Sequence, residues 1–553
     1  MGSSFFGFNI ARSGLFAAQK ALNTVSHNIA NANTEGFTRQ RLEMHSSNPD
    51  AFPGKPGVIG TGVDTEHVQQ IRDEFMDFKF RKEQTSAGEW GAKETVLKNI
   101  EAILNEPSES GIREVLDQFF SSIQELNKTP ESLTTRALVR QRGIALAKTL
   151  GGMYETLEKT QRDLNFEVRT NVSEINGYAD RVAEFNRVIY QTELNGSSAN
   201  DIRDQRNLLL DKMSELADIN YYEDSLNRFH VDINGHKIVS HYRADHLVTK
   251  ERTTKKNEFD VEKLLEVEWE SGATFNITSG KIKGILDMRD NIEGMDKGIP
   301  YYLDKLNEFA DTLSEELNRV HKTGYDLRGG TGVNFFTVNN KSTAEYEAEI
   351  LASGFNGDPA VDVTSQVMTG TSSTKTTAEN DKIIRDNIAQ IVKNTPDFKG
   401  KSIKPLSNGR FVVADRRRAS ELTISKDVED ELEKLATSDR LAGVPGNGAN
   451  ALRIGDVRHN VALFDWGSAD DFVKALVSNL GVDTQQSTRI SENSEVLLNF
   501  IKTNKMSVSG VSLDEEMSEM VKFQHSYNAN ARMINTMDEM LDLIVNRLGT
   551  VGR

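Results

Sequence analysis

Apolar residues near the start of the chain recur at alternating steps of three and four. Residues spaced in this way lie on one face of an α-helix, so the pattern predicts an amphipathic helix with a seven-residue repeat. No proline interrupts the repeat, and we therefore expect one unbroken helix. Its apolar stripe consists of Phe8, Ala11, Leu15, Ala18, Leu22, Val25 and Ile29.

The same spacing returns at the other end of the chain. Its members are Met520, Phe523, Tyr527, Asn530, Ile534, Met537, Leu541, Ile544 and Leu548, and only Asn530 among them is polar. A helix with one apolar stripe is most stable when the stripe packs against another helix. We therefore expect the first and last helices to form a coiled-coil-like pair, with the two stripes as its seam and as the assembly interface.

Both terminal helices have a predicted boundary. The first should end in a helix-to-linker turn that contains Asn33 and Gly36, because Asn and Gly tolerate the left-handed backbone that ends a helix. The last should begin after Ser512. Glu515 lies three residues further on, which predicts a capping box between these two side chains.

The regions between the termini differ in pattern. Asn234-Gly235 lies between two short apolar runs and is a strong hairpin signal. Residues 411–413 and 422–424 also have the character of strands. The predicted fold class is α+β multidomain, with an elongated helical bundle between terminal helices and β-rich inserted outer domains. The predicted units are residues 1–40 plus 512–553 (terminal coiled-coil helices, the inner tube domain), 41–71 (extended linker), 72–219 plus 282–332 plus 451–511 (helical bundle), 220–281 (β-rich) and 333–450 (variable β-rich outer domain).

The terminal helices have few partners within one chain. The two stripes supply far fewer apolar side chains than the pair has residues to order, and ordering each residue costs conformational entropy. We therefore expect the pair to be marginally stable in a single chain and to become ordered when neighbouring copies cover its remaining faces.

Composition narrows the possible functions. The 553 residues include no cysteine, which removes disulfides, thiol nucleophiles and cysteine-ligated zinc. The net charge of -17 disfavours binding to nucleic acid. No apolar run reaches the roughly 18 residues of a membrane span, and the first residues lack the basic start of a signal peptide. We expect no nucleic-acid partner, no membrane span and no cleaved signal peptide.

Two segments at opposite ends of the chain carry a family resemblance. Residues 13–40 read SGLFAAQKALNTVSHNIANANTEGFTRQ, and residues 509–516 read SGVSLDEE, followed by FQHSYNANAR at 523–532. Both segments resemble the terminal signatures of flagellar rod, hook and junction proteins. Three internal stretches narrow the resemblance to the junction proteins: residues 117–126, residues 204–210, and residues 318–325 followed by Phe335-Phe336.

The resemblance implies a structural subunit that is not an enzyme. Such a subunit would be exported through the flagellar type III pathway, with a chaperone bound near its C-terminus. It would polymerise with copies of itself outside the cell, as a ring on the end of the hook. Its other partners would be the hook protein on one side and a second junction protein towards the filament on the other. The resemblance implies no cofactor.

Several local patterns invite other hypotheses. The histidines His230, His236, His241 and His246 are spaced by 6, 5 and 5 residues, which matches no standard metal site. Gly329-Gly330-Thr331-Gly332 lacks the Lys-Ser/Thr ending of a phosphate-binding loop. Arg416-Arg417-Arg418 is expected to be a solvated strand or turn. We expect no metal ligand and no catalytic residue in these segments.

Three alternative functions remain open from the residues alone. A cell-wall hydrolase in the central insert would need two carboxylates about 5–9 Å apart in a cleft. A glycan-binding module there would need exposed aromatic residues, and the insert offers only Tyr346, Phe355, Phe398 and Phe411. The third alternative is a sibling axial role as a hook or rod protein.

Overall fold

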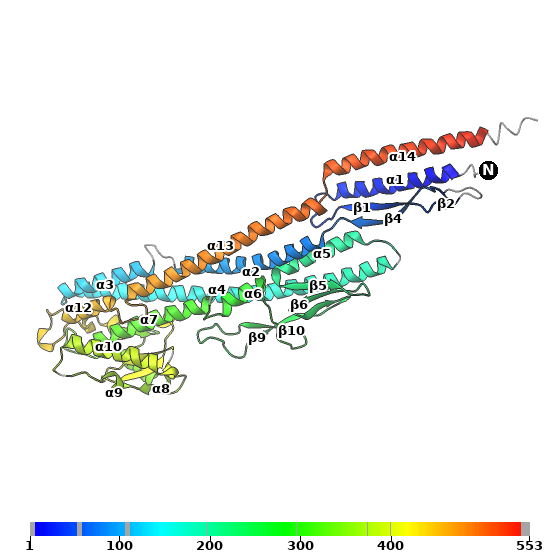
Figure 1. Cartoon of the computed structure of the whole chain (residues 1–553). Helices are drawn as coiled ribbons and strands as arrows, with labels where there is room; N and C mark the ends of the chain where they lie inside the picture. The colour runs from blue at the N-terminus through cyan, green and yellow to red at the C-terminus, as the bar shows by residue number, and fades with distance from the viewer. Residues whose placement is uncertain are drawn as a thin grey trace, which may run out of the picture.

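A computed structural model describes residues 6–51, 58–104, 111–194, 196–294, 296–372, 374–398 and 400–543 of the chain. The molecule is elongated, and its long helices run roughly along one direction (Figure 1). The principal helices are α1 (Phe6–Ala30), α2 (Glu74–Leu104), α3 (Ile112–Lys128), α4 (Leu133–Glu193), α5 (Asn200–Leu216), α6 (Lys281–Asp290), α7 (Ile299–Lys322), α12 (Ala449–Asp456), α13 (Ala469–Ser509) and α14 (Leu513–Asp542). The predicted α+β multidomain class is confirmed.

The bundle is built around α4, which extends over 61 residues. Its N-cap Ser132 accepts a hydrogen bond from the backbone N–H of Thr135, which fixes where the helix begins. Its buried side chains repeat at helical spacing and pack against α3, α5, α6 and α7. Helix α13 packs on α2 along the outside of this bundle (Figure 1). One continuous apolar core therefore joins α2, α3, α4, α5, α6, α7, α12 and the first part of α13.

The described parts of residues 41–71, expected to be an extended linker, are extended and pair as an antiparallel ribbon. Strand β1 (Gln40–Ser46) pairs with β4 (Val63–Gln70), and the short strands β2 (Asp50–Ala51) and β3 (Val58–Ile59) pair beyond it. The ribbon lies against α1. Backbone groups of an extended segment need hydrogen-bond partners, and pairing the two strands supplies them.

A β-rich segment lies on the bundle between α5 and α6, where residues 220–281 were expected to contain one. Asn234 and Gly235 have positive φ angles of 48° and 83°, so the predicted hairpin is confirmed. The strands are β5 (Ile219–Glu223), β6 (Phe229–Ile233), β7 (His236–Ser240), β8 (Arg243–Ala244), β9 (Leu247–Glu251) and β10 (Leu265–Trp269).

The insert at residues 333–450 differs from its β-rich expectation, since its described residues form more helix than strand. Its helices are α8 (Thr343–Ser353), α9 (Thr364–Val367), α10 (Thr377–Asn394) and α11 (Lys426–Asp430), with the 3-10 turns η1 (Pro396–Phe398), η2 (Ala419–Glu421), η3 (Leu432–Lys434) and η4 (Leu441–Gly443). The strands of the insert are β11 (Phe336–Val338), β12 (Val361–Asp362), β13 (Lys401–Pro405), β14 (Phe411–Asp415) and β15 (Leu422–Ile424). Beyond the insert, a further 3-10 turn, η5 (Val457–His459), follows α12. Helices α8 and α10 begin at capping boxes formed by Ser342 and Thr376. The polar composition of this region did not predict these helices.

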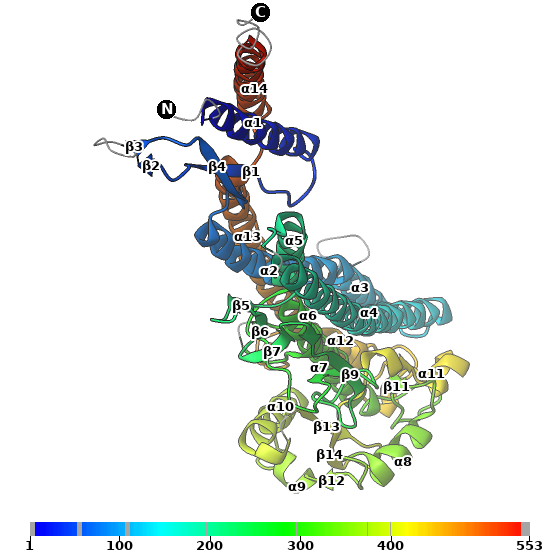
Figure 2. The same ribbon diagram turned by 90° about the vertical axis from the view of Figure 1, so that its right-hand side faces the viewer.

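The insert and the terminal helices lie at opposite ends of the molecule (Figures 1 and 2). The insert has two small apolar cores of its own and is also fastened to α7 by buried charge. Lys404 of β13 donates hydrogen bonds to Asp311 at 2.7 Å and to Glu315 at 3.1 Å. Burial by itself lowers the pKa of Lys404, but the two carboxylates raise it above its ordinary value, so the lysine is charged.

Candidate assembly surface of the terminal helices

Helices α1 and α14 pack against each other in antiparallel directions. Gly7 lies against Met537, and Gly14 lies against Asn530. Asn28 donates a hydrogen bond to Glu516 at 3.0 Å. Positions seven residues apart on α1 thus meet positions seven residues apart on α14, in the reverse order. A Cβ at Gly7 would overlap the end of the Met537 side chain, and one at Gly14 would lie 2.8 Å from the Asn530 amide, so a larger residue at either position would have to displace that side chain.

The predicted stripe of α1 lies partly inside this unit. Ala11, Ala18 and Val25 are buried, whereas Phe8, Leu15, Leu22 and Ile29 are half-buried. The described stripe residues of α14 are all half-buried, namely Met520, Phe523, Tyr527, Asn530, Ile534, Met537 and Leu541. Ile544 and Leu548 lie outside the described residues. The structure brings the two stripes into one unit but does not cover them completely.

The opposite side of α1 contacts the β1–β4 ribbon. Ser13 Oγ accepts a hydrogen bond from the backbone N–H of Val63 at 3.2 Å, and Lys20 Nζ donates one to Thr65 at 2.8 Å. Gly62, with a φ of 121°, lies directly beneath Ser13. Helix α1 is therefore held between α14 on one side and the ribbon on the other.

The predicted helix-to-linker turn follows the end of α1 at Ala30. Gly36 has a φ of 81° and lies against the side chain of Leu208 on α5, so both its conformation and its surroundings favour glycine. Asn33 is exposed and does not have a positive φ. Of the two residues, Gly36 reverses the backbone, and Asn33 lies in the turn before it.

An ionic joint fixes the start of α14. Arg39 contacts Glu516 at 2.6 Å and Glu515 at 2.7 Å. The expected capping box between Ser512 and Glu515 is absent, because the side chain of Glu515 reaches Arg39 instead. Asn28 adds two hydrogen bonds with the main chain of Gln40. The end of α1, the start of β1 and the start of α14 are therefore locked together.

A second joint connects the terminal unit with the bundle. The carboxylate of Asp204 on α5 accepts hydrogen bonds from the backbone N–H of Thr38 at 2.8 Å and from its hydroxyl at 2.6 Å. Burial raises the pKa of Asp204 to about 6, against the lowering effect of these bonds. Lys505 of α13 bridges Asp77 and Asp211, both at 2.9 Å.

Sequence reasoning missed both joints. Asp204 belongs to one of the segments that carry the resemblance, but its partner Thr38 is 166 positions away. Arg39 and Glu516 are separated by 477 positions. A local pattern carries no information about such distant partners, and only the terminal signatures at residues 13–40 and 509–516 draw attention to them.

Several of the residues considered as metal or phosphate ligands contact other groups of the chain. His236 contacts Asp245 at 2.8 Å, and His246 contacts Asp180 at 3.0 Å. The carboxylate of Asp326 accepts the backbone N–H of Gly330, so the glycine loop closes on its own chain. On the ribbon, Glu43, Glu66 and His67 come close enough to hold a metal ion, but they are largely exposed, and exposed acidic groups commonly gather without one.

The three consecutive arginines were expected to be solvated, and this expectation is wrong. Their side chains reach carboxylates of α7, α8 and α4, because the loop after β14 folds back over these helices. Arg416 faces Asp304, Arg417 faces Glu349 and Arg418 faces Glu158, at 3.4, 3.5 and 3.9 Å.

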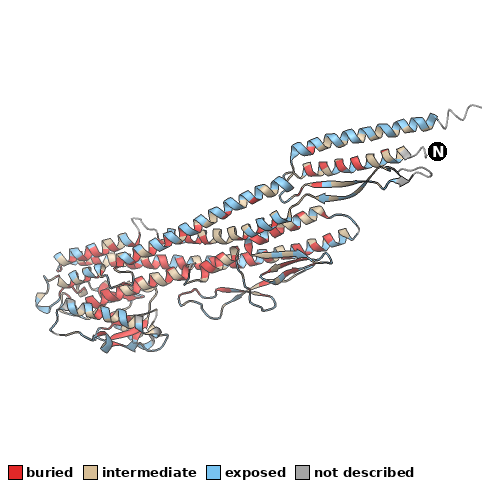
Figure 3. Cartoon of the chain, viewed as in Figure 1, coloured by how far each residue is buried: buried red, intermediate tan, exposed pale blue. Residues whose placement is uncertain are grey.

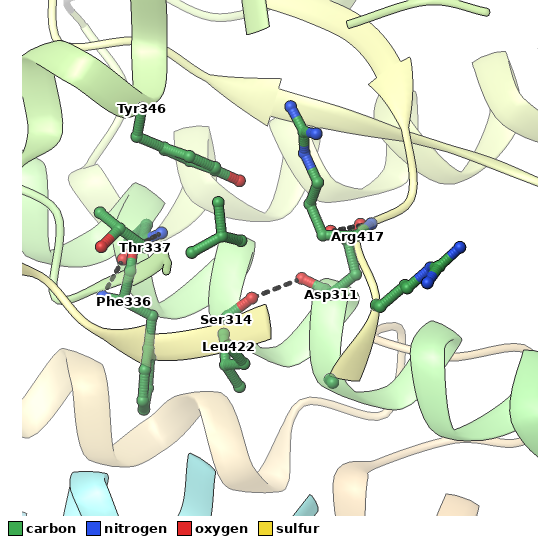
Figure 4. Close-up of a pocket in the computed structure, with 11 residues that line it drawn as sticks. Asp311, Ser314, Phe336, Thr337, Tyr346, Arg417 and Leu422 are labelled. Carbon is green, nitrogen blue, oxygen red and sulfur yellow. Dashed lines mark hydrogen bonds between the residues drawn. The ribbon is translucent and has the colours of Figure 1, made fainter. Parts of the chain in front are cut away.

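There is little space between the central insert and Asp311, the buried carboxylate of α7 that faces it. Figure 4 shows Asp311 and Ser314 of α7 facing Tyr346 and Arg417 of the insert. The cavity between them measures about 10 Å³, which is enough for about one water molecule.

The aromatic residues weighed for glycan binding contribute to the insert's own packing. Tyr346 and Phe411 are 3% and 7% exposed. The rings of Phe355 and Phe398 meet edge to face, with their centres 6.1 Å apart. Within the described residues, none of the four offers a free aromatic platform to a sugar.

No helix in the described part of the chain combines the length and the apolar character that a membrane span requires.

Three family models match separate parts of the chain. The model described as "Flagellar hook-associated protein FlgK helical domain" matches residues 97–336. The model "Flagella basal body rod protein" matches residues 8–38, which lie in α1 and the turn after it. The model "Flagellar basal body rod FlgEFG protein C-terminal" matches residues 503–548, which include α14. The two rod-type models therefore coincide with the two partners of the terminal pair.

Similar proteins agree with these matches over the whole chain. Flagellar hook-associated protein 1 of Bacillus subtilis is 29% identical over 591 residues and covers 100% of both chains. The protein of the same name in Escherichia coli is 26% identical and covers 97% of this chain and 99% of its own. The flagellar hook junction protein FlgK from Burkholderia pseudomallei has a similar fold, with a TM-score of 0.56, 12% identity, and coverage of 78% of this chain and 100% of its own.

The paired terminal helices are the segments that the two rod-type models match, so at both ends the chain is similar to structural proteins of the flagellar axis. Within that class, the predicted resemblance to the hook–filament junction proteins is confirmed, and the chain is similar to flagellar hook-associated protein 1 over its full length.

Proposed function

We propose that this chain is a structural subunit of the bacterial flagellum that forms the junction between hook and filament. The observation that carries the proposal is the incomplete burial of the terminal pair. Helix α14 has 30 residues, and Glu516 is its one buried residue among those described. A helix this exposed gains little stability from its own chain, so further packing partners would stabilise it.

The partners that suit this surface are further copies of the chain. Apolar side chains flank the seam of α14: Met517, Val521 and Met533 are 56%, 52% and 47% exposed. The stripe residues at the seam would serve as both intramolecular core and assembly interface. If the seam of one copy contacts a different surface of the next copy, the contact is head-to-tail, and such contacts repeat around or along an axis. The subunit would thus form a ring or helical layer, with terminal helices inside and the insert outside.

Two further partners follow from a place at the junction. One end of the layer would contact the hook protein, and the other would contact a second junction protein towards the filament. Before assembly, the exposed apolar side chains of α14 need a cover, which favours an export chaperone bound to the C-terminal region. Export would use the flagellar type III pathway, to an extracellular position. In this role the chain acts through binding and not through catalysis.

Deletion of the gene tests the proposed place in the flagellum. Electron microscopy of the deletion strain should show normal hooks without filaments, and filament protein should appear in the medium. Cells without hooks would indicate a hook or rod role instead. Intact filaments would contradict any axial role and direct attention to the insert at residues 333–450.

Substitutions in the seam test the assembly interface. Leu22→Asp or Leu541→Asp should abolish filament formation, because a charge at a half-buried seam position cannot be desolvated in the assembled layer. The bundle should unfold as in the wild type, within about 0.5 kcal/mol. Asn23→Asp and Asn528→Asp, at exposed positions of the same helices, are the matched controls. A Leu22→Asp strain with normal filaments would show that the seam is not needed for assembly.

A further inference from the structure

Helix α13 carries an apolar ridge that faces away from the bundle. Val482, Val496 and Phe500 are 59%, 70% and 62% exposed. Helical periodicity places Arg489 on the same face, seven residues from each of the two valines. We call these four residues the α13 ridge. The buried residues of α13 lie on the opposite face, where it packs on α2. Figure 3 shows the outer side of α13 as largely exposed.

A groove of about 800 Å³ runs between α2 and α4. Its apolar floor consists of Val96, Leu164 and Ile285, which are themselves largely buried. Its α2 side extends from Ala87 to Ile103, and no residue of α13 lines it. The ridge and the groove therefore lie on different faces of the same subunit. We call this hollow the α2–α4 groove.

The ridge and the groove match in length and in height along the molecule. The groove extends along α2 from Ala87 to Ile103, a rise of about 24 Å, and the ridge extends along α13 from Val482 to Phe500, a rise of about 27 Å. Ser494 of α13 lies 3.3 Å from Ser86 of α2, and Ser491 lies beside Gly91. The middle of the ridge therefore lies at the same position along the long axis of the molecule as the groove. A second copy that is rotated sideways, with little shift along that axis, would place its groove against this ridge.

Their charges are also complementary. Asp163 lies on the α4 side of the groove and is exposed, and Arg489 on the ridge is exposed as well. Neither forms an ion pair with any other residue in the ranges that the structure describes. Glu167, one turn beyond Asp163 in the groove, is already paired with Lys281 at 3.0 Å. On its α4 side the groove thus presents Asp163 as an acid without an ion-pair partner, and the ridge presents Arg489 as a base without one.

We propose that the α13 ridge of one subunit packs into the α2–α4 groove of the next copy of this chain, with Arg489 beside Asp163. The contact uses two different surfaces, so it is head-to-tail, and repeated rotation of the same kind generates a ring or a helical layer. This inference rests on the proposed function and names the contact that joins the bundles sideways. It adds a second layer of contacts outside the terminal helices.

Cysteine cross-linking tests the contact directly, because the native chain contains no cysteine. The variant that carries both Asp163→Cys and Arg489→Cys replaces the native protein, and hooks with their attached filaments are isolated and treated with a short bismaleimide, which spans the reach of the replaced arginine side chain. Covalent ladders of two, three and more copies are expected, since each subunit would link to both neighbours. Each single variant should stay monomeric on the gel. A double variant that is incorporated but remains monomeric would overturn the inference.

Charge reversal gives a second, independent readout in the same cells. Asp163→Arg and Arg489→Asp should each lower the number of filaments per cell roughly fivefold, because each places like charges opposite one another. The double reversal should restore most of the filaments. Single reversals without effect, or a double reversal as defective as the single ones, would overturn the contact. Absence of the wild-type protein from isolated hooks would instead contradict the proposed function.

Discussion

The bundle and the terminal pair bury their residues to very different extents. Helix α4 has 61 residues and α14 has 30, yet α4 buries 21 of its residues and α14 buries Glu516 alone among those described. Figure 3 shows the same contrast as buried colour along α4 and exposed colour along α14. The bundle completes its own core within one chain. The terminal pair leaves most of its surface uncovered within one chain, so its helices depend far less on a core of their own than those of the bundle do.

The two regions also differ in how they use buried charge. In the bundle and its insert, buried cations have several partners: Arg136 on α4 donates to the carbonyls of Pro130 and Leu435, and Lys404 contacts two carboxylates. In the terminal unit, the buried carboxylate of Glu516 contacts Arg39 and Asn28, which come from other segments. The first arrangement stabilises a core, and the second orients a helix.

The largest predicted effect concerns Lys404, which fastens the insert to α7. Lys404→Met should lower the free energy of unfolding by about 3–5 kcal/mol, because it leaves the carboxylates of Asp311 and Glu315 buried without a cation. Urea unfolding followed by circular dichroism measures this loss. Lys426→Met, at an exposed position, is the control. Adding Asp311→Asn and Glu315→Gln should recover part of the stability, and no recovery would contradict the role of charge.

A smaller effect is predicted for acidification, through His321 on α7. Burial lowers the pKa of His321 from 6.5 to about 4. Its Nδ1–H donates to the carbonyl of Val333, and its Nε2 accepts the backbone N–H of Ala436. A second ring proton would point at that N–H, so the native state requires a neutral ring.

The sign of the pH dependence follows from this depressed pKa. The stability that depends on neutral His321 is fully present above about pH 6.5 and is lost as the pH falls towards about 4, to a total of about 3 kcal/mol. Unfolding experiments between pH 7.5 and 4.5 measure the slope. His321→Gln should flatten the slope in this window relative to the wild type. An unchanged slope in the variant would assign the effect to other groups.

The smallest predicted effect concerns the joint at Glu516. Glu516→Gln should weaken the attachment of α14 by about 1 kcal/mol and leave the unfolding of the bundle unchanged, because α14 contributes little to the main core. Hydrogen exchange should speed up roughly fivefold in the amides of α14 alone. Asp514→Asn, at an exposed position in the same turn of α14, is the control. If exchange in the bundle amides sped up as much as in α14, the bundle and the terminal pair would form one cooperative unit.

Much of the fold could be predicted because helices and hairpins are encoded by neighbouring residues. The seven-residue spacing predicted two terminal helices, and the structure has α1 and α14 at those places. Asn234-Gly235 predicted its hairpin, because the positive φ angles of this turn are set by the two residues themselves. The helices of the insert were missed, since α8 and α10 lie in a region whose polar composition resembles that of loops.

The candidate site could be predicted only as far as its stripes. The half-buried positions of α14 coincide with the predicted stripe from Met520 to Leu541. The ribbon against α1, the Arg39–Glu516 contact and the Thr38–Asp204 contact could not be foreseen, because each joins segments that are far apart along the chain. The capping box at Ser512 failed for the same reason, since a distant arginine attracts Glu515.

By itself, the sequence determined which segments become helices, where apolar stripes run along them and which family the two ends resemble. These properties depend on residues within one or two turns of each other, and backbone geometry relates them directly to structure. Only the tertiary structure decided that α14 stays largely exposed, that Glu516 and Lys404 find their partners, and that the α13 ridge is level with the α2–α4 groove. Those outcomes depend on which surfaces remain uncovered once the whole chain has packed, and spacing along the chain carries no record of that.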